Sequence, residues 1–156
     1  MNKLEEIVKI AGDYFPEFLE ANKDKLGGRT GLALEVLSKT THTSRGVILG
    51  HFGASELERD KKSEANKQLN VARKIWSLIT YDWFTSFPTQ DYSKGMYGGG
   101  VAGSNVYLAV SGFPPELDHA FVCEVLKRAG EIMSGREERI RAEFELYKNH
   151  GISDAA

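Results

Sequence analysis

The first segment of the chain has apolar side chains every three or four residues, which places them on one face of a helix. They are Leu4, Ile7, Val8, Ala11 and Phe15. Pro16 follows directly, and an interior proline removes a backbone hydrogen bond and crowds the preceding turn, so we expect a kink or a break there. The glycine pair at 27–28 predicts the end of this segment.

Two later regions change to the alternating pattern of β-strands. Residues 30–38 alternate in this way, and residues 46–52 form a second short apolar run after a polar connection. Residues 106–111 alternate again, and the glycine-rich residues 98–102 precede them across a short turn. Connections this short join antiparallel neighbours, so each pair is predicted to form a hairpin.

Between the two hairpins, residues from about 64 to 84 have apolar side chains at helical spacing, which predicts a central helix. We expect this stripe to be buried: it consists of Leu69, Ala72, Trp76, Ile79 and Trp83. The preceding residues 53–63 mix charges of both signs and are predicted to form a mobile surface loop.

The last third of the chain begins with a sharp corner. Two prolines, Pro114 and Pro115, end the strand because they cannot donate to a sheet, and proline is well suited to the first turn of a helix. A helix is therefore predicted to start in the run PPELDH. The helix continues or resumes after Ser134-Gly135, where charged residues of both signs cover one face.

Together these elements predict an α+β fold, a sandwich in which helices pack on a mainly antiparallel sheet. A chain of 156 residues with 41% hydrophobic and 27% charged residues suits one globular domain, which we place at residues 1–150. Residues 151–156 are predicted to be a frayed tail.

Charge and hydropathy give no support to some classes of partner. The net charge of -2 gives no electrostatic reason to bind nucleic acid. The N-terminus does not resemble a signal peptide, and no apolar run approaches the ~18 residues that would suggest a membrane span. The sequence therefore predicts a cytoplasmic protein that binds neither nucleic acid nor a membrane.

The common enzyme motifs are missing: the chain has no P-loop, GxSxG elbow, HExxH helix or CxxC pair. The single cysteine, Cys123, lies in a helical apolar pattern, which favours an inert core thiol over a nucleophile. No metal site and no catalytic residue is predicted, and whether the protein is an enzyme stays undecided.

One stretch resembles a known family. A glycine pair, Gly99-Gly100, is followed by a hydrophobic strand and then by residues 110–120, VSGFPPELDHA. This arrangement is similar to the closing segment of the GlcG/HbpS-like family, in which a Ser-Gly-x-Pro-x-x-x-Asp-His/Glu-Ala corner enters a helix. The resemblance covers about residues 98–130. It implies a profilin-like fold, self-association and, in some members, binding of haem or another tetrapyrrole.

The candidate ligand-binding residues come from this stretch and from the central helix. A glycine-rich strand permits close approach of a ligand or another backbone, and a helix start attracts anions. At that start His119 could ligate a haem iron or a metal, or exchange a proton, with Asp118 orienting it. The alternative is that Asp118 serves the helix dipole and His119 is a surface or subunit-contact residue. Arg73 and Lys74 could hold carboxylates or propionates, or be solvated surface charges. The predicted set is Gly99, Gly100, Ser111, Gly112, Asp118, His119 and Arg73.

The leading hypothesis from sequence is a homo-oligomeric protein that binds a small ligand, with haem or another tetrapyrrole as the candidate. The alternative is a non-catalytic interaction or scaffold module that uses the same body to dimerise or to hold a protein partner. An enzyme acting on a small acid through His119 and Arg73 is the third hypothesis.

Overall fold

The computed structural model describes residues 2–52 and 57–152, and it describes only the backbone of residues 57–63. Helices and strands follow one another in the predicted order, with short 3-10 turns (η) between them. In chain order they are α1 (Lys3–Asn22), η1 (Lys23–Lys25), β1 (Thr30–Ser38), β2 (Ser44–His51), α2 (Leu57–Tyr81), η2 (Phe87–Thr89), η3 (Tyr92–Lys94), β3 (Gly100–Ala102), β4 (Val106–Ser111), α3 (Pro115–Arg128) and α4 (Ser134–Tyr147).

The four strands form one antiparallel sheet in the order β2-β1-β4-β3. The two predicted hairpins, β1–β2 and β3–β4, are both present. They are joined at the centre by pairing of β1 with β4, in a register that sets Val36 opposite Leu108. This central pairing brings the corner after β4 close to the start of β1.

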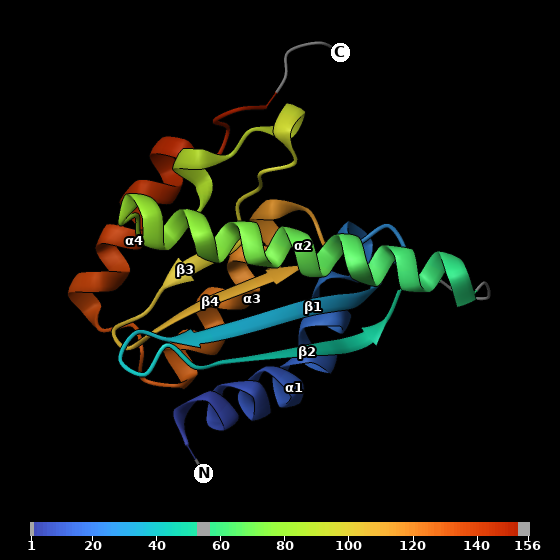
Figure 1. Ribbon diagram of the computed structural model, residues 1–156, viewed down its shortest axis with the longest axis horizontal. Helices are drawn as coiled ribbons and strands as arrows, with labels where there is room; N and C mark the ends of the chain where they lie inside the picture. The colour runs from blue at the N-terminus through green and yellow to red at the C-terminus, as the bar shows by residue number, and fades with distance from the viewer. Residues whose placement is uncertain (1, 53–56, 153–156) are drawn as a thin grey trace.

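Helices cover both faces of the sheet (Figure 1). The side chains of β1 divide by the period of two: Leu32, Leu34 and Val36 enter the larger core with α1 and α3, whereas Ala33 enters a smaller core with α2. The predicted α+β sandwich with an antiparallel sheet is therefore confirmed.

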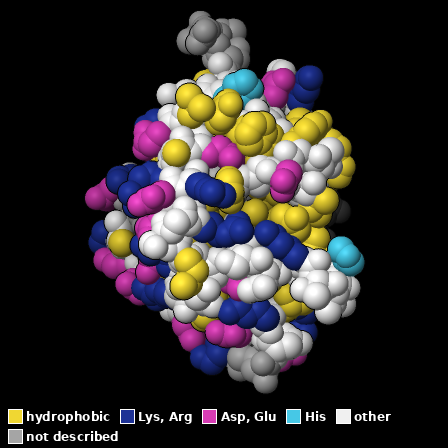
Figure 2. Space-filling model, turned by 90° about the vertical axis from the view of Figure 1, so that its left-hand side faces the viewer, with side chains coloured by type: hydrophobic (Ala, Val, Ile, Leu, Met, Phe, Trp, Pro, Cys, Tyr) yellow, Lys and Arg dark blue, Asp and Glu magenta, His cyan; other side chains and the backbone are white. Residues whose placement is uncertain are grey.

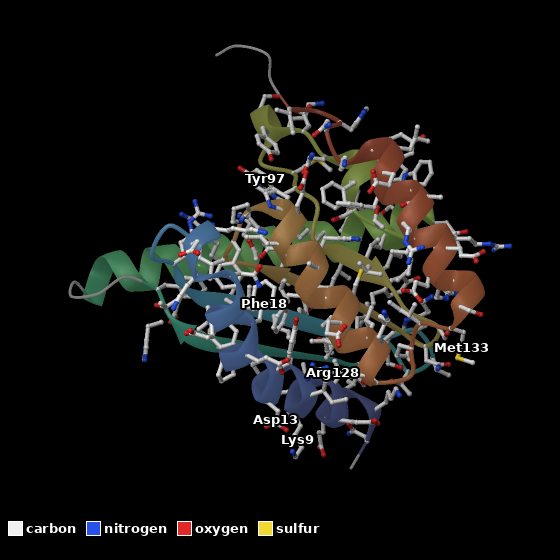
Figure 3. The ribbon with its side chains drawn as sticks, turned by 180° about the vertical axis from the view of Figure 1, so that it is seen from behind. Lys9, Asp13, Phe18, Tyr97, Arg128 and Met133 are labelled. Carbon is white, nitrogen blue, oxygen red and sulfur yellow. The ribbon has the colours of Figure 1, made fainter. Side chains whose placement is uncertain are left out.

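The larger core contains a cluster of aromatic rings from α1, α3 and the corner between β4 and α3. Phe18 lies at its centre, with ring centroids 5.2 Å from Phe121 and 5.7 Å from Phe113. Seen from behind, Phe18 lies in this part of the molecule, between α1 and the helix that carries Arg128 (Figure 3). Burial of Phe15 and Phe18 holds the turns on both sides of Pro16 in one helix, so of the predicted kink or break, the break is wrong.

Helix α2 differs from the sequence prediction in its start and in the face that it buries. It begins at Leu57, so residues 57–63 are helical and the predicted loop is wrong for them, while residues 53–56 lie outside the described part. The helix packs on the sheet through Val71, Ile75 and Leu78. Since two apolar stripes run along α2, periodicity alone could not decide which one faces the sheet. On the sheet, the small side chains of Ala33 and Ala109 pack in one cluster with Val71 and Ile75, the β-branched residues of the buried stripe.

Most of the stripe that we expected to be buried lies on the outer side of α2, whereas its last residue, Trp83, follows the end of the helix and is half-buried. Leu69, Trp76 and Ile79 are 50%, 52% and 48% exposed. Helix α3 begins at Pro115 as predicted and ends near Gly130, which has a positive φ of 71°, after which α4 starts as a separate helix. In the described part of the chain, no helix combines the length and the apolar character needed to cross a bilayer.

Candidate functional site

A cleft of about 320 Å³ opens between α2 and the start of α3. Helix α2 contributes one face to it, and the end of β4, the proline corner and the segment around η3 form the rest. Figure 3 shows Tyr97 beside the beginning of α3, at this end of the molecule. The lining residues are Arg29, Lys67, Asn70, Lys74, Tyr92, Tyr97, Ser111, Phe113, Pro114, Pro115 and Asp118.

At the base of the cleft, the side chains of Lys74 and Asp118 form an ion pair that is only 1% and 2% exposed. Lys74 Nζ lies 3.3 Å from Asp118 Oδ2 and donates a second hydrogen bond of 2.6 Å to the carbonyl oxygen of Val110. The other carboxylate oxygen, Oδ1, accepts the backbone N–H of Phe113 at 3.0 Å. The pair thus ties α2 to the corner between β4 and α3.

Burial changes the proton affinity of both groups. Loss of hydration lowers the pKa of Lys74, although the neighbouring carboxylate opposes this shift. Loss of hydration raises the pKa of Asp118 to about 6, against the effects of Lys74 and the Phe113 N–H. Keeping both groups charged in the interior therefore costs hydration free energy. Shifted pKa values of this kind are common at functional sites, although structural ion pairs also show them.

The glycine pair accommodates these two side chains. Gly99 has φ 115°, and a Cβ atom there would lie 2.7 Å from Asp118 Cβ and 2.8 Å from Lys74 Nζ. A Cβ atom on Gly100 would lie 3.1 Å from Lys74 Cβ. The close approach predicted at this strand therefore occurs, and the groups that approach are Lys74 and Asp118.

Positive charge dominates the cleft. Three cationic side chains, Arg29, Lys67 and Lys74, line it together with one carboxylate, Asp118. The first turn of α3 also lies at its wall, where the acidic residues Glu116 and Asp118 offset the positive end of the helix dipole. Such a lining can bind a carboxylate or phosphate group through charge-assisted hydrogen bonds.

Three other predicted residues lie near the cleft in different roles. Ser111 is buried and lines the cleft. Gly112 packs against the backbone of Gly31 and Leu32 in β1, so a side chain there would collide with the sheet. Arg73 is exposed and is not a lining residue; it donates a hydrogen bond of 3.4 Å to the carbonyl oxygen of Gly95, which lies between the lining residues Tyr92 and Tyr97.

His119 points to a different place, although it is the neighbour of Asp118 in α3. It lines a second cavity of about 370 Å³ between α3 and α4, where its ring stacks on Phe144 at 4.4 Å. Its Nε2 lies 3.5 Å from Cys123 Sγ, and its buried Nδ1 has no hydrogen-bond partner among the described residues. Asp118 bonds to Lys74 and Phe113, and among the described contacts it has none with the His119 ring.

Burial shifts the pKa of two residues that line this second cavity, His119 and Cys123. It lowers the pKa of His119 to about 4 and raises the pKa of Cys123 to about 12. At neutral pH the ring is therefore uncharged and the thiol is protonated, in agreement with the inert thiol predicted from sequence. In the described part of the chain, no cluster of three or more histidine, cysteine or acidic side chains could hold a metal ion.

The structure thus places Ser111 and Asp118 in the lining of one cleft and packs Gly99 and Gly100 against the Lys74–Asp118 pair. His119 lies in the second cavity, and Arg73 bonds to Gly95 without lining the cleft. In the sequence Lys74 is only one of two cations beside an apolar stripe, with a solvated surface charge as the alternative, and the structure shows that it is buried. Its helical position, three residues after Val71 and four before Leu78, is the signal that could have placed it on the buried face.

Comparisons with known proteins add no further assignment. No family model, no curated protein and no solved structure matches this chain.

Proposed function

We propose that the protein binds a small anionic molecule, a carboxylate or phosphate compound, in the cleft between α2 and the start of α3. The observation that carries this proposal is the cationic lining around the buried Lys74–Asp118 pair. Asp118 fixes the Lys74 ammonium group in the wall of the cleft. Arg29 and Lys67 add two positive charges that are not in the buried pair.

The rest of the lining suits a ligand with both polar and apolar parts. Asn70, Ser111 and the two tyrosines offer hydrogen-bonding groups, and Phe113 with the two prolines offers an apolar wall. Binding sites for small molecules typically have volumes of roughly 300–1,000 Å³. A cleft of about 320 Å³ is at the lower end of that range, which favours a small acid over a macrocycle.

Haem or another tetrapyrrole, the ligand that the family resemblance implies, stays a second candidate. Its propionates are carboxylates that Arg29 and Lys67 could bind. An iron ligand from His119 would need a rearrangement, because His119 lies in the other cavity with Nδ1 buried and Nε2 beside Cys123.

Thermal unfolding and calorimetric titration would test the proposal with defined probes: inorganic phosphate, pyrophosphate, pyruvate, citrate and haemin. We expect at least one of the four anions to raise the melting temperature and to bind saturably. The double variant R29M/K67M should weaken that binding at least about tenfold, since one charge-assisted hydrogen bond contributes about 1.5–3 kcal/mol.

A matched control is K9M/K23M, which also removes two positive charges. Lys9 and Lys23 pair with Asp13 and Glu20 on exposed parts of the chain, and Figure 3 shows Lys9 and Asp13 on the outer side of α1. This control should bind like the native protein. Equal losses in both double variants would indicate a nonspecific charge effect and contradict the proposal.

Haemin separates the two candidate ligands. Absence of binding by all four anions, together with haemin binding that H119A abolishes and R29M/K67M leaves unchanged, would replace the proposed cleft by a haem site at His119. Absence of binding by every probe would remove the proposal.

A further inference from the structure

Lys74 differs from the exposed lysines of the chain in its surroundings. Its side chain is 1% exposed and lies in the lining of the cleft. Lys9 and Lys23, in contrast, are 62% and 66% exposed. Figure 2 shows Lys and Arg side chains on one face of the molecule, several of them beside acidic side chains. An exposed lysine has a pKa near ~10.4 and is almost entirely protonated at neutral pH, so its nitrogen has no free lone pair.

Two features of the cleft favour the neutral amine of Lys74 over the ammonium ion. The first is loss of hydration, which is the largest effect on its pKa. The second is Lys67, which precedes Lys74 by two turns of α2, lines the same cleft and opposes a second positive charge there. The Asp118 carboxylate acts against both effects, yet the pKa of Lys74 stays lowered. Desolvation and a neighbouring cation are the means by which proteins make a lysine nucleophilic.

Asp118 is placed to take the proton that Lys74 gives up. Its Oδ2 lies 3.3 Å from Lys74 Nζ, while its Oδ1 is held by the backbone N–H of Phe113. Movement of one proton from Nζ to Oδ2 turns the buried ion pair into a neutral pair, and burial disfavours both charges. The carbonyl oxygen of Val110 accepts an N–H from Nζ in either state, so the amine keeps its position. A nucleophile and an acid–base group therefore lie side by side in the cleft.

The surroundings of the amine define the kind of molecule that it would meet. Arg29 and Lys67 provide positive charge for an acid group, and the amine of Lys74 reacts with a carbonyl carbon. A molecule that uses both features is an aldehyde or ketone that also carries a carboxylate or phosphate group. The cleft, at about 320 Å³, suits a small compound of this class.

We propose that Lys74 forms an imine with a small oxo acid, an aldehyde or ketone that carries a carboxylate or phosphate group, and that this reaction rests on the anion binding proposed above. The lone pair of Nζ bonds to the carbonyl carbon, and the carbonyl oxygen takes one proton from Nζ. Asp118 then returns its proton to the resulting hydroxyl group, the C–O bond breaks and water leaves. The protonated imine carries the positive charge that the ammonium ion had, and it faces the Asp118 carboxylate.

Reduction with sodium borohydride would test this reaction, because it converts an imine into a stable secondary amine. The native protein is incubated with pyruvate, 2-oxoglutarate or dihydroxyacetone phosphate, reduced, and analysed by intact mass and peptide mapping. We expect at least one of these compounds to modify Lys74 at least about tenfold faster than the exposed Lys9, which is the control within each sample. Lactate, which has the carboxylate of pyruvate but no carbonyl group, should give no adduct.

Two lysine-to-arginine variants identify the reacting nitrogen. K74R keeps a positive charge beside Asp118 but has no amine that can form an imine, so it should lose the adduct. K9R makes the same change at an exposed pair and should be modified at Lys74 like the native protein. Circular dichroism would verify that both variants are folded. Peptide mapping of the native protein identifies the modified lysine even if K74R does not fold.

Calorimetric titration with the same compounds separates this proposal from the one on which it rests. Binding that R29M/K67M weakens, without a borohydride-stable adduct at Lys74, would overturn the imine and leave the anion site in place. Equal modification of Lys74 and Lys9, or an adduct that persists in folded K74R, would also overturn it. Absence of both binding and adduct would remove both proposals.

Discussion

Lys74 Nζ lies 3.3 Å from Asp118 Oδ2, and this contact joins the middle of α2 to the first turn of α3 across 44 residues of sequence. The two side chains are almost completely buried, so their attraction acts where water does not screen it. Removal of one partner would leave the other as an uncompensated buried charge. The pair therefore decides whether the cleft keeps its shape.

The first prediction concerns this pair. K74M should lower the free energy of unfolding by about 3–5 kcal/mol, because it leaves the Asp118 carboxylate buried without its cation. K74M/D118N should lose less than K74M alone, since the neutral amide can still accept the Phe113 N–H. Urea unfolding at neutral pH measures both values.

The control for this prediction is K9M, which breaks the exposed pair between Lys9 and Asp13. Exposed pairs contribute at most about 1 kcal/mol, so K9M should be close to the native protein. A loss in K74M no larger than that in K9M would contradict the structural role given to Lys74.

The second prediction concerns the glycine beneath the pair. G99A should destabilise the protein by at least about 2 kcal/mol, because alanine disfavours a positive φ and its Cβ would crowd Asp118 and Lys74. The control is G135A: Gly135 lies in α4, where an added Cβ would meet no other atom within 4 Å, and alanine there should stabilise the helix by up to about 1 kcal/mol. Thermal unfolding of both variants checks the opposite signs.

Most strands and helices could be predicted from the sequence because hydrophobic periodicity and the positions of proline and glycine determine them locally. Alternation in residues 30–38 predicts a strand, and the structure has β1 there. The prolines at 114 and 115 predict the start of a helix, and α3 begins there. The central pairing of β1 with β4 brings together residues far apart in the chain, and no local pattern specifies it.

The orientation of α2 shows the limit of such reasoning. The aromatic and aliphatic stripe through Trp76 is the more hydrophobic one, yet the helix buries the stripe through Val71 and Ile75 and with it the cation Lys74. A rule that buries the most apolar face fails here because the charge on the other face, Lys74, is paired with Asp118 in the interior. For the same reason the sequence identified Asp118 but could not name Lys74 as its partner.

The third prediction concerns Glu131, a buried carboxylate that closes the turn between β3 and β4. Its oxygens accept hydrogen bonds from the backbone N–H of Asn105 at 2.7 Å, the Asn105 side chain at 3.0 Å and the backbone N–H of Val106 at 3.1 Å. E131A removes the two bonds to Asn105 and leaves the buried N–H of Val106 unpaired, so it should cost about 2–4 kcal/mol. E124A, which breaks an exposed pair with Arg128, should cost at most about 1 kcal/mol by chemical denaturation. Similar losses in the two variants would contradict this role of Glu131.

The last prediction concerns pH and the two neighbours Asp118 and His119. Burial lowers the pKa of His119 from 6.5 to about 4, so the native state binds this proton less readily than the unfolded chain. The contribution of neutral His119 to the free energy of unfolding is complete above pH 6.5. It is lost as the pH falls to about 4, by about 3 kcal/mol in total. Asp118 acts in the opposite direction, because its pKa is raised from 3.8 to about 6 and its protonation favours the native state over that range.

H119F separates the two contributions. Phenylalanine keeps the stacking on Phe144, removes the unpaired Nδ1 and does not titrate, so the variant should lose less stability than the native protein between pH 6.5 and pH 4. Urea unfolding at several pH values in this range measures the difference, and H51Q, at an exposed histidine, should follow the native curve. If H119F and the native protein lose stability in parallel, His119 is not the buried neutral group described above, and the acid sensitivity of the fold has to come from another carboxylate or imidazole.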